Sequence, residues 1–176
     1  MFNNKVEALV NLYTVDNGEL KILLFKKNDE PFKGYWMLPS NLILNKETVT
    51  ECADATIKEK LGIEDVYTET GTVFSKIERI PDTRIIGISV IAVIDTVKLN
   101  VDLEDNEEYS WFSVDSIPKT IYDHGEIIGM TTEMFKNKLL NTKYLKKFFP
   151  SDFTMPELQK LFEQLLSKKI DRRNFR

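Results

Sequence analysis

The residues of this chain best placed to do chemistry lie on one predicted helix, where a single acid stands beside a lysine. Because an α-helix advances about 3.6 residues per turn, Thr56, Glu59 and Lys60 share one face. Several carboxylates at such a spacing would bind Mg²⁺ or Mn²⁺, which prefer oxygen ligands and can activate water. Here one acid remains, and the Lys60 ammonium opposes a second cation but could pair with Glu59 or a ligand phosphate. The alternative is a solvated helix face with ordinary charges.

The helix that positions this face is expected from about residue 48 to residue 61. Thr48 and Glu51 have the spacing of a capping box, and Gly62 is a typical residue at a helix end. Apolar residues recur every four positions and predict a buried stripe, formed by Val49, Ala53, Ile57 and Leu61. Cys52 lies beside that stripe, so we expect a small core residue rather than a nucleophile.

Strands are predicted on both sides of this helix. Residues 6–15 and 20–25 are rich in Val, Leu and Ile and are separated by Asp-Asn-Gly, which is a hairpin signal. The β-rich run of residues 84–97 predicts a strand buried on both faces. The remaining expected elements are short strands at 35–38 and 109–114, an extended segment at 66–77 and a long helix at 121–140. This order predicts an α/β (α+β) sandwich, with a mixed sheet between helices.

The composition is that of a soluble globular protein with one good core. The chain has 176 residues, of which 42% are hydrophobic and 30% charged, and its net charge of −4 argues against a protein that coats nucleic acid. One cysteine excludes an internal disulfide, fits a reducing cytoplasm and, with one histidine, argues against a zinc site. The N-terminus carries no secretion signal, and no run reaches the roughly 18 apolar residues of a membrane helix. We therefore expect a cytoplasmic protein without a membrane partner.

The segment GYWMLPSNLILNKETVTECADATIKEKLGI (34–63) resembles a Nudix box that has lost its acids. The Nudix pattern is G-x5-E-x7-R-E-U-x-E-E-x-G-U, where U is bulky and aliphatic, and the matching residues are Glu47, Ile57, Glu59, Gly62 and Ile63. Asn41 replaces the glycine, Ala55 the arginine, and Thr56 and Lys60 replace two glutamates. In the family those glutamates hold a divalent metal. The resemblance therefore implies a Nudix scaffold with no metal site and no catalytic residue, in which Glu59 and Glu47 are remnants.

Three later blocks resemble bacterial Nudix-related transcriptional regulators, a group that includes regulators of NAD metabolism and of sugar use. They are PDTRIIGISVIAVID (81–95), EEYSWFSVDSIP (107–118) and YDHGEIIGMTTEMFKNKL (122–139), although intact ADP-ribose hydrolases share several of them. The tail from residue 148 to residue 176 is the most specific part, because in that group it opens a winged helix-turn-helix. The resemblance implies a Nudix-type ligand-binding domain at 1–142, with a mixed sheet between helices. It also implies an incomplete DNA-binding region at 143–176, the helical segment of a partial winged helix.

The tail has its own helix signals and a basic charge. Thr154 and Glu157 form a second capping box, and an amphipathic stripe follows, made of Leu158, Leu161, Phe162, Leu165 and Leu166. Asp171 is a candidate N-cap for a second helix. From residue 151 on, six Lys/Arg oppose four Asp/Glu, a net charge of +2 that leaves −6 for the remainder. The expected DNA contacts are Lys168, Lys169, Arg172, Arg173 and Arg176. Since the chain stops at Arg176, we expect weak or no operator binding by this piece; the alternative is a frayed, solvated terminus.

The resemblance also suggests where a ligand would bind. A nucleotide-sugar would lie over the loop and helix of residues 41–60, in contact with Lys60 and Glu59. Arg79 and Arg84 flank the turn before the central strand, and arginines there meet phosphate or ribose in similar proteins. Phe32 could stack on a base, as could its neighbours Tyr35 and Trp36, although aromatic residues at strand spacing are more often core. The alternative for the two arginines is exposure to solvent at a loop.

For two further sets of residues, a structural role is the alternative to a catalytic or metal-binding one. His124 is expected to cap or orient the following helix, because no Ser or Cys partner suggests a catalytic triad. A run of acids could supply a compensating metal ligand or form a solvated loop; it consists of Glu104, Asp105, Glu107 and Glu108.

Three functions remain open on this basis. The first is a non-catalytic sensor, a homodimer without a cofactor, that binds a phosphorylated sugar or an ADP-ribose-like effector and couples it to a DNA-binding tail. The second is a Nudix hydrolase of nucleoside-diphosphate compounds such as ADP-ribose, which would use Mg²⁺ or Mn²⁺ held by Glu59, Glu47 and the loop acids. The third is a scaffold that binds no ligand and only dimerises. The missing acids at positions 56 and 60 favour the sensor.

Overall fold

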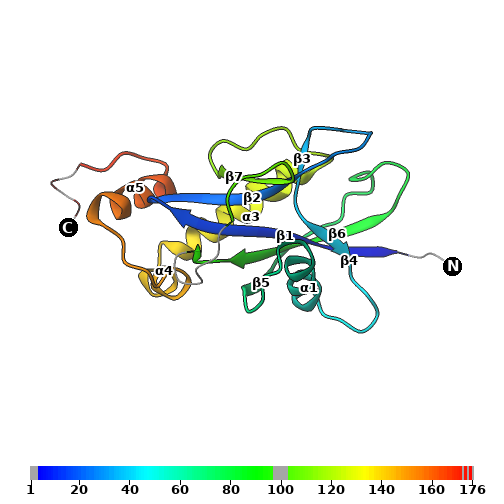
Figure 1. Cartoon of the computed structure of the whole chain (residues 1–176), viewed down its shortest axis with the longest axis horizontal. Helices are drawn as coiled ribbons and strands as arrows, with labels where there is room; N and C mark the ends of the chain where they lie inside the picture. Colours follow the sequence, from blue (N-terminus) through cyan, green and yellow to red (C-terminus); the bar gives the residue numbers. More distant parts are fainter. Residues whose placement is uncertain (1–3, 97–102, 172, 174, 176) are drawn as a thin grey trace.

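The computed structural model describes residues 4–96, 103–171, 173 and 175. Within them a seven-stranded mixed sheet lies between helices, which confirms the predicted fold class (Figure 1). The elements are β1 (Lys5–Asp16), β2 (Glu19–Lys26), β3 (Trp36–Met37), β4 (Ser40–Leu42), α1 (Val49–Leu61), β5 (Tyr67–Phe74), β6 (Ile85–Val93), β7 (Tyr109–Ser113), α3 (His124–Leu139), α4 (Thr142–Phe148) and α5 (Met155–Leu166). None of the described helices is both long enough and apolar enough to cross a bilayer.

Strand β1 organises the sheet. It pairs in parallel with β6 along residues 5–13, and its other edge is shared by β4 at residues 7–9 and β2 at residues 13–16, both antiparallel. The strand order is β3-β2-β1-β6-β5, with β7 paired to β2. Asn17 and Gly18 join β1 to β2 with φ values of 49° and 75°, as a type I′ turn requires. The hairpin predicted from Asp-Asn-Gly is therefore confirmed.

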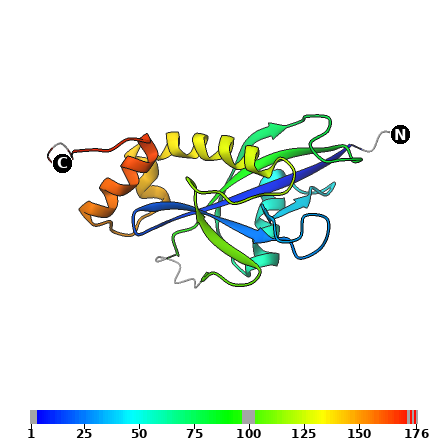
Figure 2. The ribbon, with the colours of Figure 1, turned by 90° about the horizontal axis from the view of Figure 1, so that it is seen from above.

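Helices α1 and α3 pack on opposite faces of the sheet, and Figure 2 shows α3 running along one of them. Side chains alternate along β1, so Ala8, Val10 and Leu12 face α1, whereas Leu9 and Tyr13 face α3. The helix residues that complete the two clusters are Cys52, Ala53 and Ile57 on α1 and Ile127, Ile128, Phe135 and Leu139 on α3. Both faces of the sheet are therefore buried at β1 and β6, as was predicted for the strand of residues 84–97.

Helix α1 begins and ends where the sequence predicted. Thr48 Oγ1 accepts a hydrogen bond from Glu51 N at 3.2 Å, and Glu51 Oε2 accepts one from Thr48 N at 2.7 Å. Gly62 ends the helix in the left-handed region with a φ of 69°. Cys52 is a core residue, as expected, and burial raises the pKa of its thiol to about 11.

The tail helices α4 and α5 lie at the end of the sheet where β1 turns into β2 (Figures 1 and 2). Leu145, Phe148, Leu161 and Leu165 belong to the hydrophobic cluster on the α3 face, so the tail shares its core with the sheet. The predicted boundary between residues 142 and 143 falls in the first turn of α4, a helix that the sequence did not predict.

Helix α5 is fixed to the hairpin by polar contacts as well. Gln164 Oε1 accepts a hydrogen bond from Leu20 N at 2.7 Å, and Gln164 Nε2 donates to Leu20 O at 3.3 Å. The backbone of Glu157 packs so closely on Gly18 that a Cβ there would overlap the Glu157 carbonyl. The predicted capping box of Thr154 and Glu157 is present at the start of α5.

Two details differ from the sequence prediction. Strand β4 follows Pro39 directly, where no strand was predicted, because three paired residues give too short a signal. At the C-terminus, Asp171 Oδ1 accepts a hydrogen bond from Arg173 N at 2.9 Å, as an N-cap would, but no second helix follows among the described residues. Arg172 and Arg176 lie outside the described residues, as does Val97 at the end of the predicted central strand.

Candidate functional site

The helix face that carries Glu59 meets strand β4 through Asn41. Pairing of β4 with β1 places Asn41 opposite Ala8, beside α1. Asn41 Nδ2 lies 3.0 Å from Thr56 Oγ1 and 3.2 Å from Glu59 Oε2, so this amide donates toward both. Thr56 is buried, and its hydroxyl donates in turn to Cys52 O at 2.7 Å. Hydrogen bonds thus link three residues at positions where the Nudix pattern has a glycine and two glutamates.

This set of donors and acceptors does not fit Mg²⁺ or Mn²⁺. These ions need several oxygen ligands, and here Glu59 supplies the one carboxylate. The Asn41 amide directs an N–H at that carboxylate, and the partial positive charge of this N–H would repel a cation bound there. Across the described part of the chain, no three His, Cys, Asp or Glu side chains gather in a way that could hold a metal. No metal-dependent step therefore follows from this geometry.

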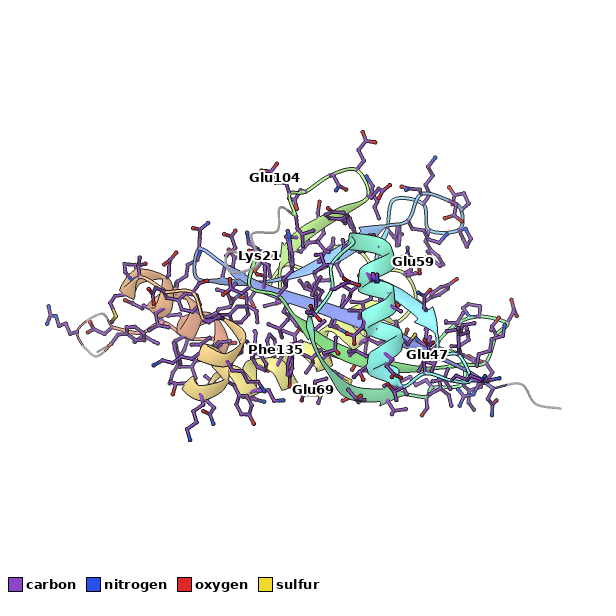
Figure 3. The ribbon with its side chains drawn as sticks, turned by 60° about the horizontal axis from the view of Figure 1, so that its bottom comes forward. Lys21, Glu47, Glu59, Glu69, Glu104 and Phe135 are labelled. Carbon is purple, nitrogen blue, oxygen red and sulfur yellow. The ribbon has the colours of Figure 1, made fainter. Side chains whose placement is uncertain are left out.

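The other acids of the hydrolase hypothesis are not brought to Glu59. Glu47 lies at the opposite end of α1 (Figure 3), where its Oε1 accepts a hydrogen bond from Leu44 N at 2.7 Å and closes the turn before the helix. Figure 3 also places Glu104 on the loop before β7, away from both glutamates. On that loop Asp105 Oδ1 accepts a hydrogen bond from Trp111 N at 2.7 Å. Glu47 and Asp105 therefore each hold a local backbone segment, and the described acids do not gather into one site.

Lys60 extends over an aromatic ring instead of pairing with Glu59. Its Nζ lies 5.6 Å from the centroid of Phe25, so of the two partners considered, Glu59 or a ligand phosphate, the structure does not pair it with Glu59. A cation over a ring at an exposed site gains only about 0.5–1 kcal/mol. The ammonium of Lys60 thus keeps hydrogen-bond donors for an anion, beside the exposed carboxylate of Glu59.

Phe32 belongs to a group of three aromatic side chains at the edge of the sheet. Its ring centroid lies 5.6 Å from that of Tyr35 and 5.3 Å from that of Tyr122. Phe32 and Tyr122 are 37% and 39% exposed, and both have a positive φ, 69° and 42°, which bulky residues rarely adopt. Such strain concentrates at functional sites. Trp36 instead packs against the core. Tyr122 was not predicted as part of this group because it lies 90 residues from Phe32 in the sequence.

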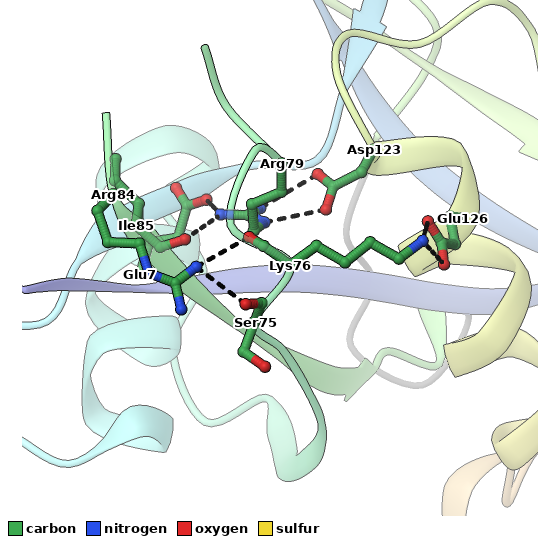
Figure 4. A network of polar contacts seen from close by, with 8 residues as sticks. All are labelled: Glu7, Ser75, Lys76, Arg79, Arg84, Ile85, Asp123 and Glu126. Atoms are coloured by element: carbon green, nitrogen blue, oxygen red, sulfur yellow. Dashed lines mark hydrogen bonds and ion pairs between the residues drawn. The ribbon is translucent and has the colours of Figure 1, made fainter. Parts of the chain in front are cut away.

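Arg79 is buried (Figure 4), which excludes the alternative of an arginine exposed to solvent at a loop. Its side chain is 0% exposed, with Nη1 donating to Glu7 Oε1 at 2.8 Å and Nε donating to Asp123 Oδ2 at 2.9 Å. Nη1 also donates to Ile85 O, and Nη2 to Asp123 Oδ1. Burial by itself would lower the pKa of Arg79, but the hydrogen bonds and charges of Asp123 and Glu7 outweigh it and raise the pKa. Arg79 therefore joins β1, β6 and the start of α3, and because its side chain is 0% exposed it does not face a ligand at the surface, contrary to the prediction.

Arg84 holds the loop that carries Arg79. Its Nη1 donates to Ser75 O and to Lys76 O, both at 2.9 Å, as Figure 4 shows. Lys76 in turn pairs with Glu126 on α3 at 2.9 Å. Arg84 is partly exposed, so its predicted contact with a ligand remains a prediction.

His124 is the first residue of α3 and is neutral. Its Nδ1 accepts a hydrogen bond from Leu38 N at 3.0 Å, and the residue is 3% exposed. Burial lowers the pKa of the imidazole to about 4; the charge of Asp123 opposes this shift, and the charge of Arg79 adds to it. Asp123, not His124, stands at the N-cap position. His124 therefore fixes α3 to the segment between β3 and β4, which agrees with the orienting role that was expected.

The basic residues predicted to meet DNA follow α5. The helix ends at Ser167, and Lys168 and Lys169 are exposed beyond it, with Lys169 Nζ 3.5 Å from a Glu163 carboxylate oxygen. Arg173 is also exposed. Their contact with DNA remains a prediction.

Comparisons with known proteins assign relatives to both parts of the chain. The NUDIX domain family matches residues 7–128, and the NrtR DNA-binding winged helix domain matches residues 146–176. The ADPR responsive transcriptional repressor NtrR of Acinetobacter baylyi is 25% identical over 169 residues, which cover 94% of this chain and 68% of the repressor. An ADP-ribose pyrophosphatase of Methanocaldococcus jannaschii is 32% identical over 109 residues, covering 61% of this chain and 63% of that enzyme. The crystal structure of Shewanella oneidensis NrtR superposes with a TM-score of 0.76 at 22% identity, covering 98% of this chain and 82% of that one.

Proposed function

This chain belongs to the NUDIX family, and on that premise we propose that it is the sensor part of a transcriptional regulator, which binds ADP-ribose or a similar phosphorylated sugar without hydrolysing it. The match of the tail to a DNA-binding winged helix and the name of the Acinetobacter repressor support the regulatory role. The observation that carries the proposal is the Asn41 amide, which donates to Thr56 and Glu59, two residues at glutamate positions of the Nudix pattern.

The exposed end of α1 supplies the groups that such a ligand needs. Lys60 offers an ammonium to a phosphate, and Glu59 offers an acceptor to a ribose hydroxyl. Phe25 lies under Lys60, and the loop that carries Phe32 begins just two residues after it. The aromatic group of Phe32, Tyr35 and Tyr122 would stack on the base. Lys60 would thus bind the phosphate near the start of the loop that follows β2, and the aromatic rings farther along that loop would bind the base.

Strand β2 gives this site a direct connection to the tail. Phe25, near one end, contacts Lys60, and Leu20, near the other, is hydrogen-bonded to Gln164 of α5. The five steps between them span roughly 17 Å of extended chain. An effector could regulate DNA binding only if its affinity differed between two arrangements of the tail. We propose that the position of β2 differs between these two arrangements of the tail. We also propose that the protein is a cytoplasmic homodimer.

A hydrolase is the second candidate, favoured by the similarity to the ADP-ribose pyrophosphatase. It would need a metal site, and the residues around Glu59 do not fit one. Incubation of the pure protein with ADP-ribose and Mg²⁺ or Mn²⁺, followed by chromatography of the products, separates the two candidates. We expect no turnover above that of a Glu59→Gln control. Turnover that this substitution abolishes would establish the hydrolase.

Thermal melting separates the sensor from a scaffold that binds nothing. A ligand that binds only the folded state at about 100 times its Kd adds about 2.7 kcal/mol to the free energy of unfolding. We expect ADP-ribose to raise the melting temperature in the presence of EDTA; phosphoribosyl pyrophosphate and free pentoses in parallel samples would define the ligand class. If none of these compounds raises the melting temperature, the remaining interpretation is a scaffold that binds no ligand.

A further inference from the structure

Helix α4 carries a lysine face, and we propose that this face binds the phosphate backbone of duplex DNA. The proposal extends the DNA-binding part of the proposed function to a helix that precedes the basic residues of the C-terminus. It does not depend on the ligand site, which is at the opposite end of β2.

The sequence around α4 is basic in a chain that is acidic overall. Residues 134–151 contain no Asp or Glu but five lysines, which are Lys136, Lys138, Lys143, Lys146 and Lys147, whereas the whole chain has a net charge of −4. This segment is therefore a local run of positive charge in the sequence.

Three of these lysines lie on one side of α4. Lys143, Lys146 and Lys147 have the spacing i, i+3 and i+4, which places them on one face, and all three are exposed. Leu145 and Phe148 occupy the opposite side and are buried in the core that α4 shares with α3 and α5. The core therefore holds the helix with its lysine face outward.

The lysines of α4 differ from those at the end of α3 in their partners. Lys136 pairs with Asp115 at 3.3 Å, and Lys138 pairs with Glu69. Among the described residues, neither Lys143 nor Lys146 has an acidic partner, and Lys147 lies over the ring of Tyr67 at 4.9 Å. The charges of Lys143 and Lys146 thus have no acidic partner among the described residues, whereas the charge of Lys147 helps to lower the pKa of Glu69.

Stabilisation of α4 itself does not explain this pattern. Cations are favourable near the C-terminus of a helix, which would account for Lys146 and Lys147. Lys143 is in the first turn, where the helix dipole favours an acid, and no acid is present there. A polyanionic partner explains all three lysines together.

Duplex DNA fits this face better than a membrane does. Lys146 and Lys147 fall within the segment that matches a DNA-binding winged helix, and Lys146 lines a groove of about 480 Å³ between α4 and α5 together with Phe153 and Phe162. A helix that binds a bilayer surface inserts an apolar face, but the apolar face of α4 is already buried. Lysines at the spacing of α4 span roughly 6 Å along the helix, and duplex DNA carries one charge per about 1.7 Å of its axis, so two or three phosphates are within reach.

The test measures how the affinity for DNA depends on salt. A labelled duplex of random sequence is titrated with the full chain by fluorescence anisotropy, between about 50 and 200 mM salt. The variant has Lys143→Gln, Lys146→Gln and Lys147→Gln. A control variant with Lys5→Gln, Lys46→Gln and Lys58→Gln has the same net charge, and a third variant carries arginine at the three α4 positions. Circular dichroism and ADP-ribose binding report whether each variant folds.

Each lost phosphate contact lowers the slope of log Kd against log salt by about 0.9. We therefore expect the α4 glutamine variant to lose about 2 from this slope, with at least about tenfold weaker binding at low salt, and the control and arginine variants to keep the affinity. An equal loss in the control variant, or wild-type protein that does not bind the duplex, would overturn the proposal. So would unchanged duplex binding together with lost binding to phosphatidylserine vesicles, which would assign the face to membranes. Failure of ADP-ribose binding in the wild type would instead count against the proposed ligand site alone.

Discussion

Replacement of Arg79 by methionine should destabilise the fold far more than it affects any ligand. Methionine keeps much of the apolar volume but removes the cation between Glu7, which is 8% exposed, and Asp123. Two nearly buried carboxylates would then face each other without a counter-ion. Removing one partner of a buried ion pair typically costs about 3–5 kcal/mol, because the remaining charge stays desolvated.

Urea denaturation at neutral pH measures this loss. With a slope of about 2 kcal/mol per molar urea, the midpoint of unfolding should fall by about 2 M. Arg84→Met is the matched control: it removes contacts of a partly exposed side chain to Ser75 O and Lys76 O, and should cost about 1 kcal/mol.

A rescue experiment separates the ion network from a general packing defect. Adding Glu7→Gln and Asp123→Asn to Arg79→Met removes the unpaired charges, so the triple variant should recover part of the lost stability. The reasoning is refuted if Arg79→Met lowers the free energy of unfolding by less than about 1 kcal/mol. If that stable variant also lost ADP-ribose binding, Arg79 would be a ligand residue after all.

Three other predictions test separate parts of the structure. Because burial lowers the pKa of folded His124 to about 4, below its usual 6.5, its contribution to the free energy of unfolding is complete above pH 6.5 and falls by up to about 3 kcal/mol toward pH 4. Urea denaturation of a His124→Gln variant at several pH values should give a free energy of unfolding that lacks this part of the pH dependence. The same pH dependence in the variant and in the wild type would contradict the low pKa of His124. Gly18→Ala should cost at least about 2 kcal/mol, since φ is 75° and the new Cβ would overlap the Glu157 carbonyl; hydrogen exchange should rise in α5. Thr56→Glu with Lys60→Glu should create Mn²⁺ binding in calorimetry, and no gain would mean that the Nudix pattern is misaligned on α1.

The elements that sequence predicted well are those with local signals. The start of α1 depends on Thr48 and Glu51, three residues apart, and the β1–β2 turn on Asn17 and Gly18. Their hydrogen bonds and φ values follow from the residue types alone. Strand β4 and helix α4 were missed because three and seven residues give too short a pattern to recognise.

The candidate site was less predictable because its contacts are distant in sequence. Arg79 was predicted to contact a ligand, with exposure to solvent as the alternative, because its partners Glu7 and Asp123 lie 72 and 44 residues away and could not be recognised. The preference of Lys60 for Phe25 over its neighbour Glu59 likewise depends on how α1 packs on β2. The replacement of Nudix glutamates at positions 56 and 60 could be read from the sequence, but the hydrogen bonds of the Asn41 amide to Thr56 and Glu59 could not, because they require β4 to bring Asn41 beside the helix.

Isothermal titration of ADP-ribose into the full chain, with and without EDTA, tests the central claim most directly. The account predicts binding of the same affinity in both samples and no slow heat of hydrolysis when Mn²⁺ is added. Binding that vanishes in EDTA and returns with Mn²⁺ would contradict it, because the hydrogen-bonded cluster of Asn41, Thr56 and Glu59 would then have to open to admit the ion.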